Sequence, residues 1–263
     1  MVHLKPLPGS PTFSATDTDI DDVEEAALRD ARALASGGAD AFLVENFGDA
    51  PFHAERVSPV TIAAMTRIVR RIVVEVAEPA GLAVGVNVLR NDAIGALAIA
   101  AATGGRFIRV NVHVGAMLTD QGVVEGRAAK TLRRRAALRL GPGSSLPVAI
   151  LADIGVKHAT PLSQGWSLEA EATDAWNRGL ADALIISGGG TGEPTPESHL
   201  ELVRSAVPEA SVLIGSGVDE ESFAGRLGSA DGWIVGSALK DGGDVHSAVT
   251  ERAVSRLSRL RMG

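Results

Sequence analysis

Short runs of apolar, mostly β-branched residues alternate with longer stretches of helical period along the whole chain, and this alternation restricts the fold more than any other feature. It is typical of repeated βα units around a parallel sheet. Eight units can be counted in the 263 residues, close to the usual size of an eight-unit barrel. The sequence therefore predicts an α/β fold, a single (β/α)8 TIM barrel with parallel strands, as one domain over residues 1–263.

The apolar runs are the expected strands, and four of the intervening segments carry a clear amphipathic pattern. Strands are expected at 2–5, 41–46, 82–89, 107–113, 148–154, 183–187, 212–215 and 232–235, and helices at 23–36, 59–77, 91–104 and 247–260. Glycines in SGGAD, TGGR and NRGLAD are expected to end three helices in a left-handed cap. The stretch GPGSSLP at 141–147 is interpreted as a loop within the barrel, because the alternation continues on both sides of it.

Charge and composition exclude several classes of protein. The 25 basic and 32 acidic residues give a net charge of −7, which disfavours broad binding to nucleic acid or to an anionic membrane. The chain has no cysteine, so it has no disulfide and no thiolate nucleophile. The N-terminal MVHLKPLPGSP has too short an apolar run for a signal peptide, and no later run has the length of a membrane span. We therefore expect a cytoplasmic protein, without membrane insertion and without a nucleic-acid partner.

Polar residues collect at the carboxyl ends of the expected strands, where barrel enzymes carry their active sites. Side chains alternate along a strand, so Arg109, Asn111 and His113 share one face of the fourth strand and aliphatic residues share the other. The candidate catalytic residues form a ring of such strand ends: His3, Glu45, Asn87, Asn111, His113 and Asp153. A purely structural role stays open for each of them, because buried polar groups need partners whatever their task.

This ring could support metal binding or proton transfer. Histidine and carboxylate side chains suit a divalent metal such as zinc, manganese or magnesium, but no H-x-H or H-x-x-x-H spacing supports such a site. A divalent metal is thus an open cofactor, and no other cofactor is expected. In DIGVKHATPL, Asp153 and Lys157 could act together in proton transfer, although their spacing departs by two residues from the D-x-K motif of orotidine-phosphate decarboxylases. We favour Asp153, because Lys157 is expected in the following loop.

Three consecutive glycine-rich turns follow the last three expected strands, in ISGGGTGEPTP, IGSGVDEES and WIVGSALKDGG. Glycine lets the backbone approach an anion closely, and barrels that bind phosphate use the loops after strands seven and eight. The expected phosphate-binding residues are Gly188, Gly189, Thr191, Gly192, Gly215, Ser216, Gly217, Gly236 and Ser237. Lys240 could add a positive charge there. The alternative is that these glycines serve only tight turns.

Two other segments bear on function. The loop VGAMLTDQGVVEGRAAK after the fourth strand could be a lid that brings Asp120 or Arg127 over a ligand, or it could be a passive surface loop. The run LRRRAALR at 132–139 is interpreted as the solvent-facing side of a helix. Barrels of this kind often self-associate, and Phe47, Phe52 and the outer helices could form the contact, so we expect a homo-oligomer.

The ordered motifs MVHLKPLPGSP, AFLVENFGDAPF, GVNVLRND, IRVNVHVGAMLTDQGVVEGRA, ADIGVKHATPL, ISGGGTGEPT, GSGV and WIVGSALK resemble the BtpA/SgcQ family over essentially the whole chain. The resemblance implies a phosphate-binding (β/α)8 barrel. The cyanobacterial branch of that family is associated with photosystem I accumulation, and other members occur with sugar-transport and sugar-metabolism genes, so the resemblance implies no particular reaction. The family's N-terminal extension has no counterpart before the first expected strand, which would leave the bottom of the barrel less plugged.

The leading hypothesis is an enzyme that acts on a sugar phosphate or a related phosphorylated metabolite, of the isomerase, epimerase or lyase type. Asp153, His113 and Glu45 would then have acid–base or metal-binding roles. Hydrolase chemistry is also open. The alternative is a non-catalytic binding or assembly factor that uses the barrel as a scaffold, since fold does not fix function. A third hypothesis is a nucleotide-binding regulator, which would bind phosphate without turnover.

Overall fold

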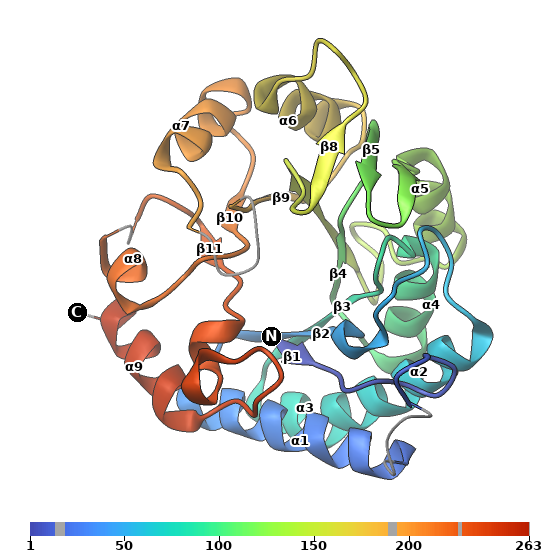
Figure 1. The fold of residues 1–263 in the computed structure, drawn as a ribbon, viewed down its shortest axis with the longest axis vertical. Coiled ribbons are helices and arrows are strands. Elements are labelled where there is room, and N and C mark those ends of the chain that lie inside the picture. The colour runs from blue at the N-terminus through green and yellow to red at the C-terminus, as the bar shows by residue number, and fades with distance from the viewer. Residues whose placement is uncertain (14–18, 189–193, 226–227, 263) are drawn as a thin grey trace.

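Eight parallel strands form one curled sheet in the computed structural model, which describes residues 1–13, 19–188, 194–225 and 228–262 (Figure 1). Their order in the sheet follows their order along the chain. The strands are β1 (Val2–His3), β2 (Ala41–Glu45), β3 (Ala83–Asn87), β4 (Phe107–Val110), β7 (Ala149–Ile154), β9 (Ala183–Ile186), β10 (Val212–Ile214) and β11 (Gly232–Trp233). The predicted parallel α/β barrel architecture is confirmed, and each strand is somewhat shorter than predicted.

Helices cover the outer side of the curled sheet (Figure 1). They are α1 (Ile20–Gly37), α2 (Pro59–Ile72), α3 (Glu78–Ala80), α4 (Ala93–Thr103), α5 (Ala128–Ala137), α6 (Leu168–Asn177), α7 (Glu197–Ala206), α8 (Glu220–Gly225) and α9 (Glu251–Met262). A π-helical turn, Val73–Ala77, joins α2 to α3. The four helices predicted from amphipathic patterns are all present, as α1, α2 with its π-helical extension, α4 and α9.

Local capping signals explain where several of these helices begin and end. The Asp19 side chain accepts hydrogen bonds from two backbone N–H groups of the first turn of α1. Gly38 and Gly104 end α1 and α4 with φ angles of 90° and 91°, as predicted. The third predicted glycine cap is wrong, because the left-handed residue after α6 is Leu180, with a φ of 49°. Gly179 is needed there for space instead, since a Cβ atom on it would lie 2.6 Å from a backbone oxygen of α6.

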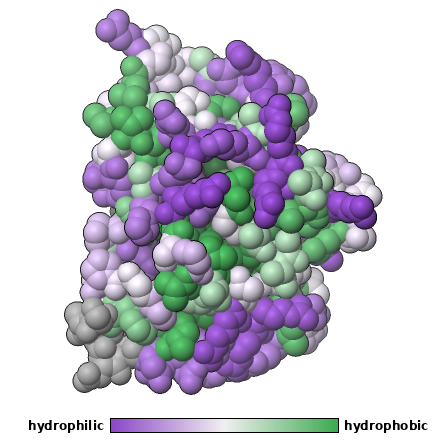
Figure 2. Space-filling model, turned by 90° about the vertical axis from the view of Figure 1, so that its right-hand side faces the viewer, coloured by the Kyte–Doolittle hydropathy of each residue, from purple (hydrophilic) through white to green (hydrophobic). Residues whose placement is uncertain are grey.

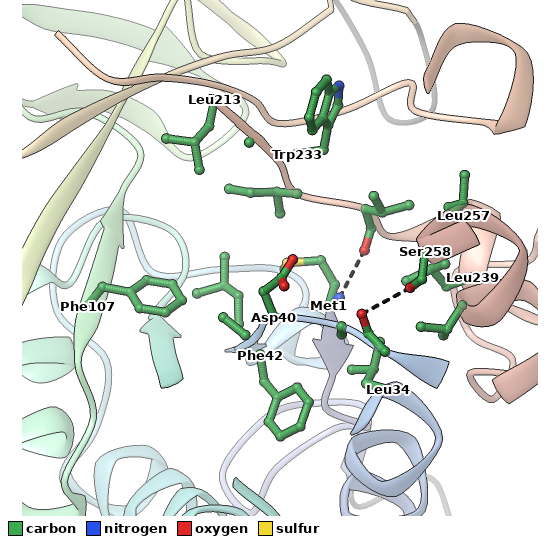
Figure 3. A pocket seen from close by; sticks show the side chains of 18 of the residues that line it. Met1, Leu34, Asp40, Phe42, Phe107, Leu213, Trp233, Leu239, Leu257 and Ser258 are labelled. Carbon is green, nitrogen blue, oxygen red and sulfur yellow. Dashed lines mark hydrogen bonds between the residues drawn. The ribbon is translucent and has the colours of Figure 1, made fainter. Parts of the chain in front are cut away.

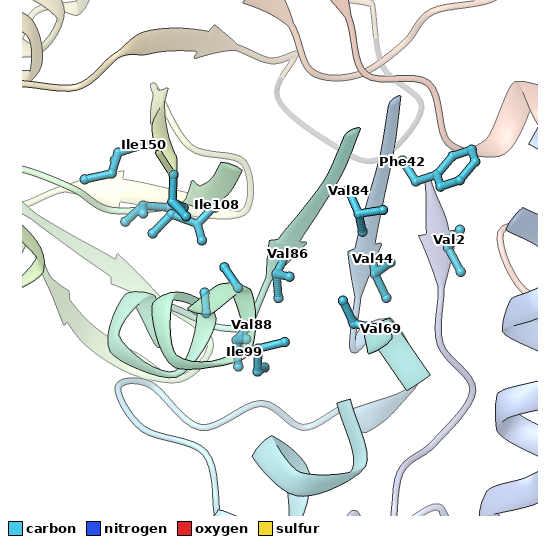
Figure 4. Close-up of a cluster of buried hydrophobic side chains, with 14 of the residues drawn as sticks. Val2, Phe42, Val44, Val69, Val84, Val86, Val88, Ile99, Ile108 and Ile150 are labelled. Atoms are coloured by element: carbon cyan, nitrogen blue, oxygen red, sulfur yellow. The ribbon is translucent and has the colours of Figure 1, made fainter. Parts of the chain in front are cut away.

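The outer face of the sheet forms the main hydrophobic core with the helices (Figure 4). Phe42 and Val44 of β2 and Val84 and Val86 of β3 are at most 2% exposed. They have the same parity on neighbouring strands, so they all project to the helix side of the sheet. Burying each such side chain contributes roughly 1.5–3 kcal/mol to the stability of the fold. This packing fixes the strands whose other face lines the barrel.

The inner face of the sheet changes from apolar to charged along the strands. Leu43, Phe107 and Leu151, near the amino ends of β2, β4 and β7, line an apolar cavity of about 560 Å³ at the base of the barrel (Figure 3). Two residues further along, the same three strands carry Glu45, Arg109 and Asp153. Barrel chemistry takes place at the carboxyl ends of the strands. The polarity gradient therefore separates an apolar base from a charged top.

The two end strands of the sheet, β1 and β11, are joined by contacts of the residues around them. The N-terminal amine of Met1 donates to the carbonyl oxygen of Val235 at 2.9 Å. Next to this joint, the buried Lys240 ammonium donates to Oδ2 of Asp30 at 3.0 Å, and the backbone N–H of Val249 donates to the other oxygen of the same carboxylate. Lys240 therefore ties the loop after β11 to α1, and its place in the fold does not support the predicted role as a charge at the phosphate site.

A three-stranded antiparallel sheet lies over the carboxyl ends of β4 and β7. It contains β5 (Ala116–Thr119), β6 (Gly122–Glu125) and β8 (Ala159–Pro161), in the order β6-β5-β8. The long loop after β4 is thus a hairpin paired with the loop after β7. One face buries Met117, Val124 and Val156, whereas Leu118 and Val123 are about half exposed, at 48% and 50%. Figure 2 shows hydrophobic patches among hydrophilic side chains on the face of the molecule that lies at the right of Figure 1.

Candidate functional site

A buried ion pair between β4 and β7 forms the centre of the charged end of the barrel. The guanidinium of Arg109 donates to both oxygens of Asp153, from Nε to Oδ1 at 3.0 Å and from Nη2 to Oδ2 at 3.1 Å. Both side chains are almost completely buried. Two parallel hydrogen bonds of this kind fix the orientation of the carboxylate as well as its charge. Asp153, a predicted catalytic residue, is therefore held rigidly by Arg109.

The two asparagines of the predicted ring extend this network toward β3. Asn111 donates through Nδ2 to Oδ2 of Asp153 at 2.6 Å. Asn87 donates to Oδ1 of Asn111 at 3.3 Å and to the carbonyl oxygen of Arg109 at 3.2 Å. Within the described part of the chain, Oδ1 of Asn87 is buried without a hydrogen-bond partner. Buried polar atoms are normally paired, so Asn87 has a free acceptor at the end of the network.

Glu45 and His3 lie beside each other at the ends of β2 and β1. Nε2 of His3 lies 4.0 Å from Oε1 of Glu45, and the imidazole stacks on Phe47 with ring centroids 4.5 Å apart. Burial raises the pKa of the Glu45 carboxyl, although the nearby charges of Arg109 and Lys157 oppose this shift. Burial also lowers the pKa of His3 to about 3, so its imidazole is neutral at physiological pH. The pair therefore combines a carboxyl group that holds its proton more readily than usual with a neutral imidazole.

Lys157 lies in the loop after β7, as predicted, and this position places it at the charged end of the barrel. Burial lowers the pKa of its ammonium to about 8, and Arg109 acts in the same direction, whereas Asp153 and Glu45 oppose the shift. The guanidinium of Arg90 donates to the backbone carbonyl of Lys157 at 2.7 Å. Sequence reasoning weighed Lys157 but chose Asp153 over it. The missing information was the path of the loop, which the spacing of the two residues does not contain.

The loop that carries Lys157 is anchored by Glu171 of α6. A single oxygen of this carboxyl, Oε2, accepts from the backbone N–H of Gly155 at 3.0 Å and from Nε1 of Trp166 at 2.9 Å. Burial raises the pKa of Glu171 to about 7. The Glu171 side chain thus connects both ends of the β7 to α6 loop. No sequence motif drew attention to it, since one glutamate in an amphipathic helix carries no signal.

The glycine-rich loops after β10 and β11 approach these side chains closely. A Cβ atom on Gly215 would lie 2.5 Å from Cγ2 of Ile185 and 3.4 Å from Nη2 of Arg109. A Cβ atom on Gly236 would lie 3.4 Å from Cε1 of His3. Glycine is therefore required at 215 for space. These contacts bring the two predicted groups of residues, catalytic and phosphate-binding, to one place.

The loops after β9, β10 and β11 also contain donors suited to an anion. The backbone N–H of Gly188 donates to Oγ of Ser216 at 3.0 Å, which links the loops after β9 and β10. Among the described residues, the N–H groups of Gly217, Gly236 and Ser237 donate to no backbone carbonyl oxygen. Unpaired backbone N–H groups of neighbouring turns can bind an anion together. Three further residues of the predicted phosphate site, Gly189, Thr191 and Gly192, lie outside the described residues.

A small cavity joins the side chains and the loops, and we call it the upper cavity. Its lining includes His3, Glu45, Arg109 and Lys157 together with Gly215, Ser216, Gly217, Gly236 and Ser237. Its volume is about 70 Å³, which is enough for about five water molecules, and hence for a group with as many heavy atoms as a phosphate. The upper cavity therefore combines an acid–base pair, two cationic side chains and the glycine-rich loops.

His113 is separate from this cluster. Its Nε2 atom lies 2.8 Å from the carbonyl oxygen of Gly179, in the turn between α6 and β9. Burial lowers the pKa of His113, and the charged groups that act on it are Arg135 and Asp182 rather than Asp153 or Glu45. The expected sharing of one face with Arg109 fails because β4 ends at 110, after which strict alternation no longer applies. The catalytic role predicted for His113 is thus without support from its position.

Other predictions about the site have mixed outcomes. No group of three or more histidine, aspartate or glutamate side chains in the described part of the chain could hold a metal ion, so the predicted ring does not assemble as a metal centre there. Arg127, directly before α5, pairs with Glu55. Burial lowers the pKa of Arg90, and the charge of Asp120 opposes this shift. Phe47 stacks on His3, so it contributes to the site rather than to an outer contact. Self-association stays a prediction.

Comparison with known proteins places this architecture in a family. The sequence model of the BtpA family matches residues 1–262. The chain belongs to the BtpA family. The photosystem I biogenesis protein BtpA of Synechocystis sp. is 47% identical to it, over 97% of this chain and 84% of that protein. SgcQ of Escherichia coli is 32% identical, over 97% of this chain and 90% of that protein. The resemblance seen in the sequence motifs is therefore confirmed.

Solved structures with a similar fold include TIM-barrel enzymes. Orotidine 5'-phosphate decarboxylase from Pyrococcus horikoshii superimposes with a TM-score of 0.57 at 15% identity, over 91% of this BtpA-family chain and 95% of the enzyme. KGPDC from Streptococcus mutans has a TM-score of 0.55 at 11% identity, over 92% of each chain. At such identities the likeness shows the fold alone. Within its described part, the chain has no helix with both the length and the apolar character required to cross a membrane.

Proposed function

We propose that this BtpA-family chain binds a phosphorylated small molecule in the upper cavity and acts on it as an enzyme of the isomerase, epimerase or lyase type. A sugar phosphate is the favoured ligand class. The observation that carries the proposal is that one cavity is lined both by titratable side chains at strand ends and by the glycine-rich loops after β10 and β11. Barrels that bind phosphate use these two loops.

The local charge supports an anionic ligand although the whole chain is acidic. Arg90, Arg109 and Lys157 act on the same two carboxylates, Glu45 and Asp153. Three cationic side chains therefore face two acidic ones, and burial favours the protonated form of Glu45. Charge of one sign in a low-dielectric cavity attracts a ligand of the opposite sign. The negative charge of a phosphoryl group would balance the excess of positive charge in the cavity.

The proposed division of roles follows from the hydrogen bonds. The phosphoryl group would accept from the N–H groups of Gly217, Gly236 and Ser237. Glu45 and Lys157 would transfer protons, because both have pKa values displaced toward neutrality by burial. Asp153 would position Arg109, since its oxygens already accept from that guanidinium and from an asparagine. Several fold neighbours act on phosphorylated compounds by their names, which agrees with this proposal.

The test is a thermal-shift screen against sugar phosphates, nucleotides and inorganic phosphate, with Gly236→Val as the site variant. A ligand at about one hundred times its Kd stabilises the native state by about 2.7 kcal/mol, which raises the Tm of a chain of this size by roughly 5–10 °C. We expect Gly236→Val to abolish that rise, because its side chain would enter the upper cavity beside His3. Gly141→Val is the control, since a Cβ atom there meets nothing within 4 Å. Absence of a shift with every phosphate compound would refute the proposal.

A second candidate function is a non-catalytic assembly factor. The observation that favours it is the 47% identity to a protein named for photosystem I biogenesis. The two candidates differ in what Glu45→Gln should do once a ligand is known. An enzyme should lose turnover with little change in ligand affinity, whereas an assembly factor should keep its binding and its assembly activity alike.

A further inference from the structure

Lys157 differs from Lys240, the lysine buried beside the joint between β1 and β11, in having no carboxylate partner in the part of the chain that the structure describes. Lys240 is neutralised by Asp30 at 3.0 Å. Among the described residues, no carboxylate oxygen lies within 4 Å of Nζ of Lys157 and no hydrogen bond is made by that atom, although the side chain lines the upper cavity. The Lys157 side chain is half-buried, and loss of hydration disfavours the charged form of an amine that has no partner. Lys157 is therefore a candidate for chemistry that needs a neutral amine.

The surroundings of Lys157 favour its neutral form. Arg109 of β4 and Arg90 of the loop after β3 disfavour a third positive charge, while Asp153 of β7 and Glu45 of β2 partly offset them. The balance, dominated by burial, gives Lys157 a pKa of about 8. At about pH 8 roughly half of the amine is then uncharged, against about 1% at pH 6. A lysine that is partly desolvated beside other cations is a recognised type of amine nucleophile.

A proton donor lies in the same cavity. The carboxyl of Glu45 is buried, which raises its pKa, and it lines the upper cavity together with Lys157. Addition of an amine to a carbonyl group requires such a group, because the carbonyl oxygen must be protonated before it can leave as water. An amine, a proton donor and anion-binding loops thus surround one small space.

From this juxtaposition we propose that Nζ of Lys157 forms an imine with the carbonyl carbon of a phosphorylated aldehyde or ketone whose phosphoryl group lies on the glycine-rich loops. The inference rests on the proposed function and names its substrate class. It also assigns Lys157 as a catalytic residue, in place of the role that the sequence suggested for Asp153.

The step is balanced without an oxidant or a reductant. The nitrogen lone pair forms a C–N bond, the C=O π bond breaks, and the oxygen takes a proton from the Glu45 carboxyl to give a carbinolamine. The carbinolamine oxygen takes a second proton, the one released by the nitrogen, and leaves as water, which leaves a C=N bond. The positive imine then withdraws electrons from the neighbouring carbon, which is what isomerase and lyase reactions of carbonyl compounds require.

Reductive trapping tests the imine. The native protein is mixed with glycolaldehyde phosphate, dihydroxyacetone phosphate or ribose phosphate and with cyanoborohydride, which converts an imine to a stable secondary amine. The matched controls are the corresponding alcohols, such as glycerol phosphate, which bear the same phosphoryl group without a carbonyl. Intact-mass measurement and peptide mapping report the yield and the position of the label. Thermal shift with the same compounds reports binding independently.

We expect one label per chain, on Lys157, from at least one carbonyl compound and from none of the alcohols. The initial labelling rate should rise with pH below the pKa of Lys157, about 8, as the neutral fraction of the amine grows, and it should fall again where Glu45 loses the proton that the step requires. Lys157→Arg should abolish the label and reduce the thermal shift of the carbonyl compounds to that of the alcohols, whereas Lys130→Arg, on the outer helix α5, should change neither label nor shift.

Three results would overturn the inference. A label on the amine of Met1, which also lines the upper cavity, or one spread over surface lysines, would show that Lys157 is not the nucleophile. Equal thermal shifts from carbonyl compounds and alcohols without any label would also refute the imine, while leaving the proposed phosphate site intact. Absence of both shift and label with every compound would instead refute the proposed function and the inference together.

Discussion

Glu171→Gln is expected to stabilise the protein at neutral and alkaline pH, although it removes a charge that takes part in two hydrogen bonds. Both bonds, from Gly155 and from Trp166, end on the same oxygen of the Glu171 carboxyl. The carbonyl oxygen of a glutamine can accept both of them. The substitution therefore keeps the anchor of the β7 to α6 loop and removes only the cost of holding a negative charge in a buried place.

The magnitude follows from the pKa of Glu171. A value of about 7, against an ordinary value of 4.5, corresponds to about 3 kcal/mol at 1.36 kcal/mol per unit. Because the pKa of this acid is higher in the native state than in the unfolded chain, the native state holds more protons between pH 4.5 and about 7, and stability falls as the pH rises through that range. The cost is complete above about pH 7 and vanishes below the unfolded pKa.

Urea denaturation at about pH 8 and about pH 4 measures this difference. Glu171→Gln should raise the free energy of unfolding by up to about 3 kcal/mol at the higher pH and leave it unchanged at the lower one. Glu169→Gln, two residues earlier on α6, makes the same chemical change and serves as the control. Equal stabilisation at both pH values, or a loss at the higher one, would show that burial of the Glu171 charge is not what limits stability.

Two further substitutions test the polar contacts inside the barrel. Asp153→Asn should lower the free energy of unfolding by about 3–5 kcal/mol, because the buried Arg109 guanidinium would lose its counter-charge. An additional Arg109→Met replacement should recover part of that loss. If it recovers none, loss of the ion pair is not the cause. Lys240→Met should lower the free energy of unfolding by a similar amount, about 3–5 kcal/mol, since the Asp30 carboxylate would stay buried without its partner. A change near zero would mean that the hydrogen bond from the Val249 N–H is enough to stabilise the Asp30 charge.

The strands and most helices could be predicted because their signals are local. Short apolar runs between helical stretches predicted the place of all eight strands, since each strand buries apolar side chains in the core. The cap after α6 could not be predicted. Gly179 is needed there because a side chain would clash with a backbone oxygen, not because its φ is left-handed. Residue type alone does not distinguish these two reasons for a glycine.

The site could be predicted only as far as alternation along the strands holds. Glu45, Asn87, Asn111 and Asp153 come together because they end or follow regular strands. His113 does not join them, since it lies three residues beyond the end of β4. The parity of Arg109 correctly predicted that its side chain points into the barrel. Its ion pair with Asp153, however, depends on the distance between β4 and β7. The path of a loop and the partner of a charged side chain depend on tertiary contacts, so local sequence patterns do not predict them.

A ligand bound in the upper cavity should reduce local opening of the barrel wall at the joint between β1 and β11. Both strands are two residues long, and they stand at opposite ends of the hydrogen-bonded order of the sheet. Local openings cost least free energy where few backbone bonds must break, so amide hydrogens there should exchange with solvent sooner than those of β3 or β4. The upper cavity is lined from both sides of this joint, by His3 and by Gly236. A ligand held there would act as a bridge across it, and slower exchange along this line would report occupancy of the cavity without any assay of chemistry.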